Sequence, residues 1–266
     1  MKIYSKVFIL AFALGVTAAA GPAAGAMCRG VILESAGRDT PRVVAGDARL
    51  VEKPACPASV FKLVIAWAGL ETGVLTPETR IACDEPRIAS ACVEIGMRDA
   101  LLRSSNRFFE VIAERLGRVR LTEFASRSGL FREPLPETWL GAKLPSAVWG
   151  GTLRTTPARL HVFTQRIAAG DVGSASVSRA LEAAIEWPCG TATVRVFGKS
   201  GTMRKAVWFT GYGRSGDGAV RCVTVFLEGG LERRPEAAAM FFDRFGMRPP
   251  EPPPLGDGVT MRERGR

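Results

Sequence analysis

Histidine is nearly absent from this sequence of 266 residues, which contains a single one, His161. A Ser-His-Asp triad needs a histidine as the general base beside its serine. His161 lies inside a helical pattern, and nothing near it in the sequence suggests such a triad. We therefore interpret it as a packed or surface side chain, and a serine nucleophile in this chain would need another base.

The sequence also has no Cys-x-x-Cys pair and no cluster of histidine and cysteine, so it does not support a zinc site or any other metal site. Its six cysteines are an even number in a chain that we expect to be exported, which favours disulfides over metal ligation. Cys83 and Cys92 are close enough in sequence to close a small loop. The other four can pair in more than one way: Cys28, Cys56, Cys189 and Cys222.

No basic stripe interleaved with aromatic residues occurs, although the formal net charge is +10. The arginines are scattered along the chain, which argues against a nucleic-acid partner. The letters of a dinucleotide-binding motif occur at Gly211, Gly213 and Gly216, but this segment leaves a strand for a hairpin turn and has no helix after it. The positive charge suits carboxylate-bearing substrates and an acidic cell-wall polymer.

The first 26 residues have the pattern of a secretory signal peptide. Lys2 and Lys6 precede an apolar run over 7–20, and the small residues Ala24 and Ala26 form an Ala-x-Ala cleavage pattern. A lipoprotein signal at Cys28 is disfavoured because Met27 stands where a small residue is required. We expect export to the periplasm, one domain over 27–247, and a proline-rich disordered tail over 248–266.

Strand patterns lie toward both ends of the mature chain, at 31–33, 42–45, 191–197, 206–212 and 220–227. Helical patterns lie between and after them, at 59–70, 98–103, 108–116, 121–128, 157–170, 178–185 and 235–245. The segment 80–96 has no regular pattern, and 131–151 reads as a long loop. The order predicts an α+β fold, an antiparallel sheet of five-stranded type flanked by helices, with a helical subregion.

The apolar helix predicted from Ser59 carries the strongest chemical signal. Its pattern indicates a buried helix that ends at Gly73, with Lys62 three residues after Ser59 and on the same face. At this spacing the lysine amine can take the serine proton, and backbone N–H groups at the helix start can bind an oxyanion. We therefore predict Ser59 as the nucleophile and Lys62 as its base.

Two further motifs follow in a characteristic order. Ser104 and Asn106 form a Ser-x-Asn motif between two helical patterns, and Lys199 opens Lys-Ser-Gly-Thr near a strand. Ser-x-x-Lys, Ser-x-Asn and Lys-Ser/Thr-Gly in this order are the signature of penicillin-recognising serine enzymes.

The amino-acid sequence around the first motif resembles that of class D β-lactamases, within the wider superfamily of β-lactamases and penicillin-binding proteins. Pro-Ala-Ser-Val-Phe-Lys at 57–62 and Leu-Glu-Thr-Gly at 70–73 are similar to class D segments, as is the strand over 206–212. The resemblance covers 31–246. Asn106 departs from it, because class D enzymes usually carry valine there, whereas transpeptidases and class A enzymes carry asparagine.

The resemblance implies roles for further residues. Ser104 would relay a proton to the leaving nitrogen, and the electrostatic field of Lys199 would support this transfer. A strand N–H near Met203 would complete the oxyanion site. Ser200 and Thr202, in the motif that includes Gly201, would bind the substrate carboxylate together with Arg234 or its neighbour Arg233. A loop tryptophan packs over the lysine in the family, and Trp149 fits that position. No cofactor is implied beyond a carbamate on Lys62, which we expect to form in part.

Three functions remain open at this point. The first is a class D-like β-lactamase that hydrolyses its acyl-serine. The second is a D,D-transpeptidase or carboxypeptidase acting on the D-Ala-D-Ala end of peptidoglycan. The third is a sensor-like module that binds β-lactams and stays acylated, although no membrane span of the kind that anchors such modules is visible. We predict the hydrolase, while the oligomeric state is open.

Overall fold

The structure is a computed structural model that describes residues 29–141, 144–191, 193–251 and 255. The predicted signal peptide and Cys28 lie outside these residues, as does the predicted tail apart from 248–251 and 255. Among the described helices, none is both long and apolar enough to cross a membrane.

One antiparallel sheet organises the described chain, with the strand order β2-β1-β8-β7-β6-β5. Its strands are β1 (Gly30–Ala36), β2 (Arg42–Gly46), β5 (Glu186–Trp187), β6 (Val194–Met203), β7 (Ala206–Ser215) and β8 (Val220–Glu228). The predicted α+β class with an antiparallel sheet is confirmed. The sixth strand, β5, was missed because its two residues are too few to form an alternating pattern.

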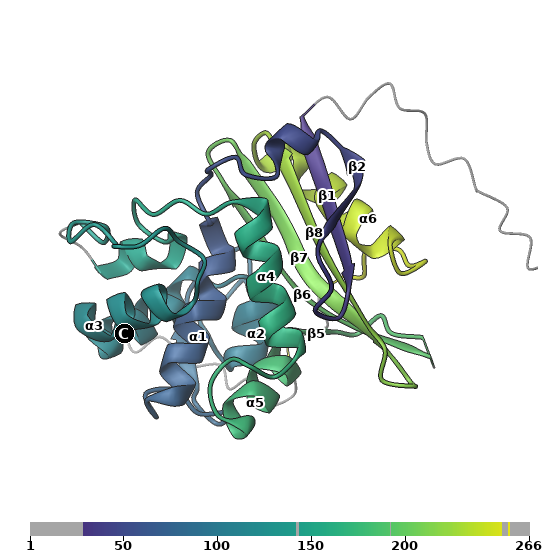
Figure 1. Cartoon of the computed structure of the whole chain (residues 1–266). Helices are drawn as coiled ribbons and strands as arrows, with labels where there is room; N and C mark the ends of the chain where they lie inside the picture. The colour runs from purple at the N-terminus through teal and green to yellow at the C-terminus, as the bar shows by residue number, and fades with distance from the viewer. Residues whose placement is uncertain (1–28, 142–143, 192, 252–254, 256–266) are drawn as a thin grey trace, which may run out of the picture.

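Helices cover both faces of this sheet (Figure 1). The helices are α1 (Lys62–Glu71), α2 (Met97–Leu102), α3 (Asn106–Arg127), α4 (Pro157–Ala168), α5 (Ala175–Ile185) and α6 (Arg234–Asp243). Short 3-10 turns are η1 (Ala48–Leu50), η2 (Ala58–Phe61), η3 (Leu144–Trp149) and η4 (Leu231–Arg233). α4 packs on β1, β7 and β8 from one side, and α6 packs on β6, β7 and β8 from the other. β7 is therefore buried on both faces over its first eight residues.

The segment predicted as one helix from Ser59 is divided in two. Ser59 lies in η2, and the α-helix begins only at Lys62. Ala58, directly before the serine, has φ +51, a left-handed conformation that is strained for a residue with a side chain. From Lys62 to Gly69 every residue is buried, so the predicted central buried helix is confirmed.

The two helices predicted at 108–116 and 121–128 form a single element, α3. Gly117 breaks its helical geometry with φ 73 and ψ 169, which explains why the pattern looked like two helices. The segment 80–96, predicted to be irregular, contains a small hairpin of β3 (Ile81–Cys83) and β4 (Val93–Ile95). Strands of three residues are too short to show a period.

The predicted Cys83–Cys92 disulfide is absent from the structure. All five cysteines within the described ranges are free thiols. Cys83 lies opposite Val93 in the β3–β4 hairpin, and Cys92 precedes β4 without a strand partner of its own. The Cys83 sulfur instead lies 3.3 Å from Glu85 Oε2.

Candidate active site

The start of η2 and the third motif lie against each other. A Cβ atom added to Gly201 on β6 would lie 3.1 Å from the backbone nitrogen of Ser59 and 3.0 Å from that of Val60. Only a glycine lets the strand come this close to the turn. The contact places the half-buried Ser59 beside Lys-Ser-Gly-Thr. Two motifs that are about 140 residues apart in sequence are thus neighbours in space.

The Lys62 side chain is fully buried and reaches the second motif. Its Nζ donates to the carbonyl oxygen of Ser104 at 2.7 Å and to Oδ1 of Asn106 at 2.7 Å, and it lies 3.3 Å from the Ser104 hydroxyl. The ring of Phe109 lies 5.9 Å away. A neutral amine can donate to the two carbonyl oxygens and still offer its lone pair to a serine hydroxyl.

Burial, followed by the charge of Arg87, lowers the pKa of Lys62 to about 7. The carboxylates of Glu85 and Glu110 act in the opposite direction, and Arg234 adds to the lowering. Near neutral pH, a substantial fraction of this amine is therefore unprotonated. This is the state that a base needs in order to accept a proton.

The Ser104–Asn106 segment is a tight turn at the start of α3. Ser104 has φ +60, which directs its carbonyl toward Lys62, and Ser105 caps the helix by accepting a hydrogen bond from the Phe108 N–H at 3.1 Å. Ser104 and Ser105 are both buried. The strained turn thus presents the Ser104 hydroxyl and the Asn106 amide to one amine.

Two residues that the sequence did not reveal fix this turn. Glu85 accepts hydrogen bonds from the backbone N–H groups of Asn106 at 3.0 Å and Arg107 at 3.3 Å, and also from the Ser105 hydroxyl. Arg87 donates to Glu85 Oε1 and to the Ser104 carbonyl, each at 2.6 Å. Burial opposes ionisation of Glu85, but these hydrogen bonds outweigh it and lower its pKa to about 2. No local sequence motif contains Glu85 and Arg87 together with their partners, because the partners lie about twenty residues further along the chain.

On the sheet side, Lys199 and Arg234 meet at Ser200. Lys199 is buried and donates to the Ser200 carbonyl at 2.8 Å, and Arg234 Nη2 lies 3.3 Å from Ser200 Oγ. Burial, followed by the charges of Lys62 and Arg234, lowers the pKa of Lys199 well below its usual range. The neighbouring Arg233 turns away and pairs with Glu236 at 2.6 Å. The structure therefore places Arg234, and not Arg233, at the site.

The remaining predicted residues lie close by. Met203 ends β6, and its sulfur lies 3.7 Å from the Cys56 thiol. The Thr202 hydroxyl is buried without a hydrogen-bond partner among the described residues, so its side chain would have to turn in order to reach a ligand carboxylate. Trp149 ends η3, and its carbonyl lies 3.5 Å from the Cys56 thiol. Its predicted place over Lys62 stays a prediction.

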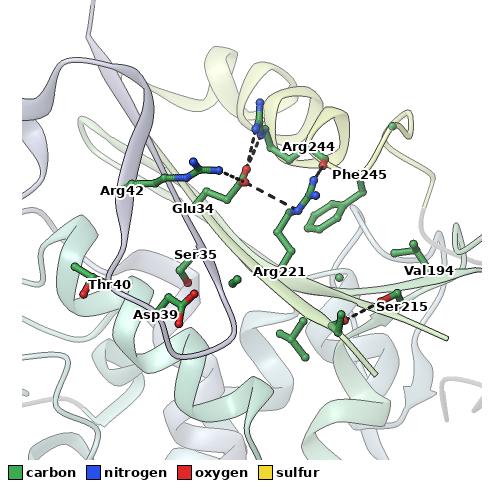
Figure 2. Close-up of a pocket in the computed structure, with 15 residues that line it drawn as sticks. Glu34, Ser35, Asp39, Thr40, Arg42, Val194, Ser215, Arg221, Arg244 and Phe245 are labelled. Carbon is green, nitrogen blue, oxygen red and sulfur yellow. Dashed lines mark hydrogen bonds and ion pairs between the residues drawn. The ribbon is translucent and has the colours of Figure 1, made fainter. Parts of the chain in front are cut away.

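A cavity of about 710 Å³ lies beside the end of α6, away from these motifs (Figure 2). There the buried Glu34 faces three arginines, and Arg244 holds its carboxylate at 2.8 Å. The other two are Arg42 at 3.4 Å and Arg221 at 4.0 Å. Neither Ser59 nor Lys62 lines this cavity, so it is separate from the candidate active site.

His161 is fully buried between α4 and the sheet. Its ring nitrogens lie 2.9 Å from the Ser35 hydroxyl and 3.1 Å from the Thr224 hydroxyl. Burial lowers its pKa to about 4, against a smaller opposing effect of Glu34. Of our two interpretations, a packed histidine is the correct one. Among the described residues, no group of histidine, cysteine or acidic side chains could bind a metal ion.

Comparisons with known proteins agree with this geometry. The family model of the penicillin-binding protein transpeptidase domain matches residues 30–172. No curated protein sequence matches the chain significantly. Solved structures of similar fold include the BPu1 β-lactamase, with a TM-score of 0.71 and 14% identity, and a class D β-lactamase from Bacillus subtilis, with 0.69 and 14%. The class D β-lactamase BSU-2 delta mutant has a TM-score of 0.70 and 16% identity. In each case 82% of this chain and 92% of the other are covered.

Proposed function

The chain belongs to the family of the penicillin-binding protein transpeptidase domain, and we propose that it is a class D-like β-lactamase that hydrolyses β-lactams through an acyl-enzyme at Ser59. One observation carries this proposal. Lys62, one turn after Ser59, is buried, with its amine at the Ser-x-Asn turn, while Gly201 of the third motif packs against the Ser59 nitrogen. All three motifs thus surround one serine.

In the proposed reaction, neutral Lys62 takes the proton of the Ser59 hydroxyl as its oxygen attacks the β-lactam carbonyl. The backbone N–H groups of Ser59 and of β6 near Met203 stabilise the oxyanion. When the C–N bond breaks, the proton passes to the leaving nitrogen through the Ser104 hydroxyl, which lies 3.3 Å from the lysine amine. Hydrolysis of the ester by water then releases the product and regenerates the serine.

The substrate carboxylate would bind at the sheet side of the site. Ser200 and Arg234 offer a hydroxyl and a guanidinium there, and the Thr202 hydroxyl would join them on turning toward the ligand. Lys199 lies beside this group, because its amine donates to the Ser200 carbonyl at 2.8 Å. Such a site suits both a penicillin carboxylate and the C-terminus of a peptide.

The contacts of Lys62 favour a free amine as the base. Two of its neighbours are the acceptor oxygens of Ser104 and Asn106, which suit N–H donors. A carbamate would replace N–H donors with negative oxygens, and the Ser104 carbonyl cannot donate to them. Asn106 could turn its amide to do so, which makes it the residue that decides between the two forms.

A D,D-transpeptidase or carboxypeptidase is the second candidate, and Asn106 favours it. This asparagine bonds to the lysine amine at 2.7 Å, where class D enzymes usually have valine. The peptidase would use the same acylation steps on a D-Ala-D-Ala peptide. Both activities fit an exported protein, and we propose a periplasmic location on the basis of the N-terminal sequence.

A labelling and turnover experiment tests the proposal. The protein is incubated with a fluorescent penicillin, digested, and the adduct is mapped by mass spectrometry, while nitrocefin hydrolysis is followed in parallel. We expect the label on Ser59, its loss in Ser59→Ala, and repeated turnover of nitrocefin. Label on Ser59 without turnover would favour the peptidase, and label retained by Ser59→Ala would refute the site.

A further inference from the structure

An ion pair outside the three motifs is built into the acylation site. Glu85 stands at the N-terminus of α3, where it accepts hydrogen bonds from two backbone N–H groups and from the Ser105 hydroxyl. A carboxylate there neutralises the exposed N–H groups and the positive end of the helix dipole. Glu85 thus fixes the start of the helix that carries Asn106.

Arg87 connects this cap to the lysine. One of its terminal nitrogens donates to both Glu85 and the Ser104 carbonyl, each at 2.6 Å. The same carbonyl oxygen accepts the Lys62 amine at 2.7 Å. Two nitrogen donors therefore converge on one oxygen atom, which belongs to a residue in a strained, left-handed conformation. Without Arg87, the Ser104 turn would lose a bond that opposes relaxation of this strain.

We propose that Glu85 and Arg87 are positioning residues that hold the Ser104–Asn106 turn against Lys62 and place two opposite charges at this turn. This inference rests on the proposed function, because Lys62 is the base only if Ser59 is acylated. Neither residue belongs to the three motifs from which the site was predicted.

The charges that face Lys62 come from four parts of the chain. They are Glu85 and Arg87 before β4, Glu110 on α3, Lys199 on β6 and Arg234 at the start of α6. After burial, Arg87 has the largest effect on the pKa of Lys62 and lowers it, whereas Glu85 raises it. Removing Arg87 should therefore raise the pKa of Lys62, whereas removing Glu85 should lower it, although both changes break the same ion pair.

The test measures the rate of acylation by a fluorescent penicillin between pH 5 and pH 9, in single-turnover conditions. The amine must be neutral, so the rate rises with pH and its midpoint reports Lys62. In Arg87→Gln the midpoint should move up by about one pH unit, the size of effect that a single close charge produces. In Glu85→Gln it should move down. Both variants should also lose roughly tenfold in plateau rate, because the Ser104 turn is less well positioned.

Matched controls use an ion pair at the far end of α3. Glu123 and Arg127 lie 3.1 Å apart there, and neither Glu123→Gln nor Arg127→Gln should move the midpoint. Arg87→Lys keeps the charge and should restore the midpoint. Midpoints that stay fixed in both variants, or move in the same direction, would overturn the proposal.

A second measurement separates this inference from the proposed function. Protein labelled with ¹³C at the lysine ε carbon is titrated by NMR, with Lys62→Arg assigning the signal. The same opposite shifts are expected in Arg87→Gln and Glu85→Gln, even if no penicillin reacts. Absence of acylation with opposite titration shifts would refute the function alone, whereas unchanged titration would refute the role of the pair.

Discussion

Gly201 and Ser59 are so close that a single added carbon on the glycine would lie 3.1 Å from the serine nitrogen. Gly201→Ala should push β6 away from η2 and disturb the N–H groups proposed to bind the oxyanion, with a loss of about tenfold or more in acylation rate. Stopped-flow labelling with a fluorescent penicillin measures it. Gly216→Ala is the control, because a Cβ there meets nothing within 4 Å. Equal rates in the two variants would contradict the importance of this contact.

Arg234 and Arg233 are adjacent but face different partners. Arg234→Ala should raise KM and lower kcat/KM by roughly 10- to 150-fold, which corresponds to about 1.5–3 kcal/mol for a lost charge-assisted bond. Arg233 bonds to Glu236 and to the Glu228 carbonyl, so Arg233→Ala should leave kcat/KM nearly unchanged. Steady-state kinetics with nitrocefin compares them. A larger effect of Arg233→Ala would show that the carboxylate binds elsewhere.

We expect Asn106 to determine whether Lys62 is a free amine or a carbamate. Added bicarbonate should leave the wild-type rate unchanged, because the Ser104 and Asn106 oxygens accept from a free amine. Asn106→Val removes one acceptor and makes the pocket less polar, so the rate of deacylation should increase and become dependent on bicarbonate. Turnover with and without bicarbonate measures the dependence of the rate, and NMR with ¹³C-labelled bicarbonate detects a carbamate on Lys62. A wild type activated by bicarbonate would mean that the lysine is carbamylated, as the sequence had led us to expect.

His161 should make the fold sensitive to acid. Its pKa is about 4 in the folded protein, below the ordinary value of 6.5, so between these values the unfolded chain binds more protons. The stability contributed by the neutral ring is complete above pH 6.5 and is lost as the pH falls toward 4, by about 3 kcal/mol in total. Urea unfolding at several pH values should show this loss in the wild type but not in His161→Gln. The same pH dependence in both proteins would exclude His161 as its source.

The sequence alone predicted those parts of the fold and the candidate site that have a local sequence pattern. The apolar run after Lys62, the three motifs and the long strands over 194–228 are each readable from a short window, and the α+β class follows from their order. Ser59 and Lys62 were predicted for the same reason. The 3-10 turn at Ser59 was not predicted, because the sequence does not show the left-handed conformation of Ala58 before it.

What the sequence did not reveal depends on contacts between distant segments. Nothing in the sequence around Glu85 indicates a role for it, because its partners, the N–H groups of Asn106 and Arg107, reach it only in the folded chain. The choice between Arg233 and Arg234 likewise depends on which way each side chain leaves the start of α6. The β3–β4 hairpin, in which Cys83 pairs with Val93, was likewise not visible in the sequence.

The pairing of β1 with β8 has a consequence for how the protein can be made. Residues 30–36 pair with the nearby β2 on one side but with 220–228 on the other, and β6, which flanks Ser59, also comes late in the chain. A ribosome must therefore release nearly the whole polypeptide before the sheet can close, and pairings of such long sequence separation form slowly. We therefore expect the surroundings of Ser59 to be completed only after β6 has been synthesised and has paired with β7.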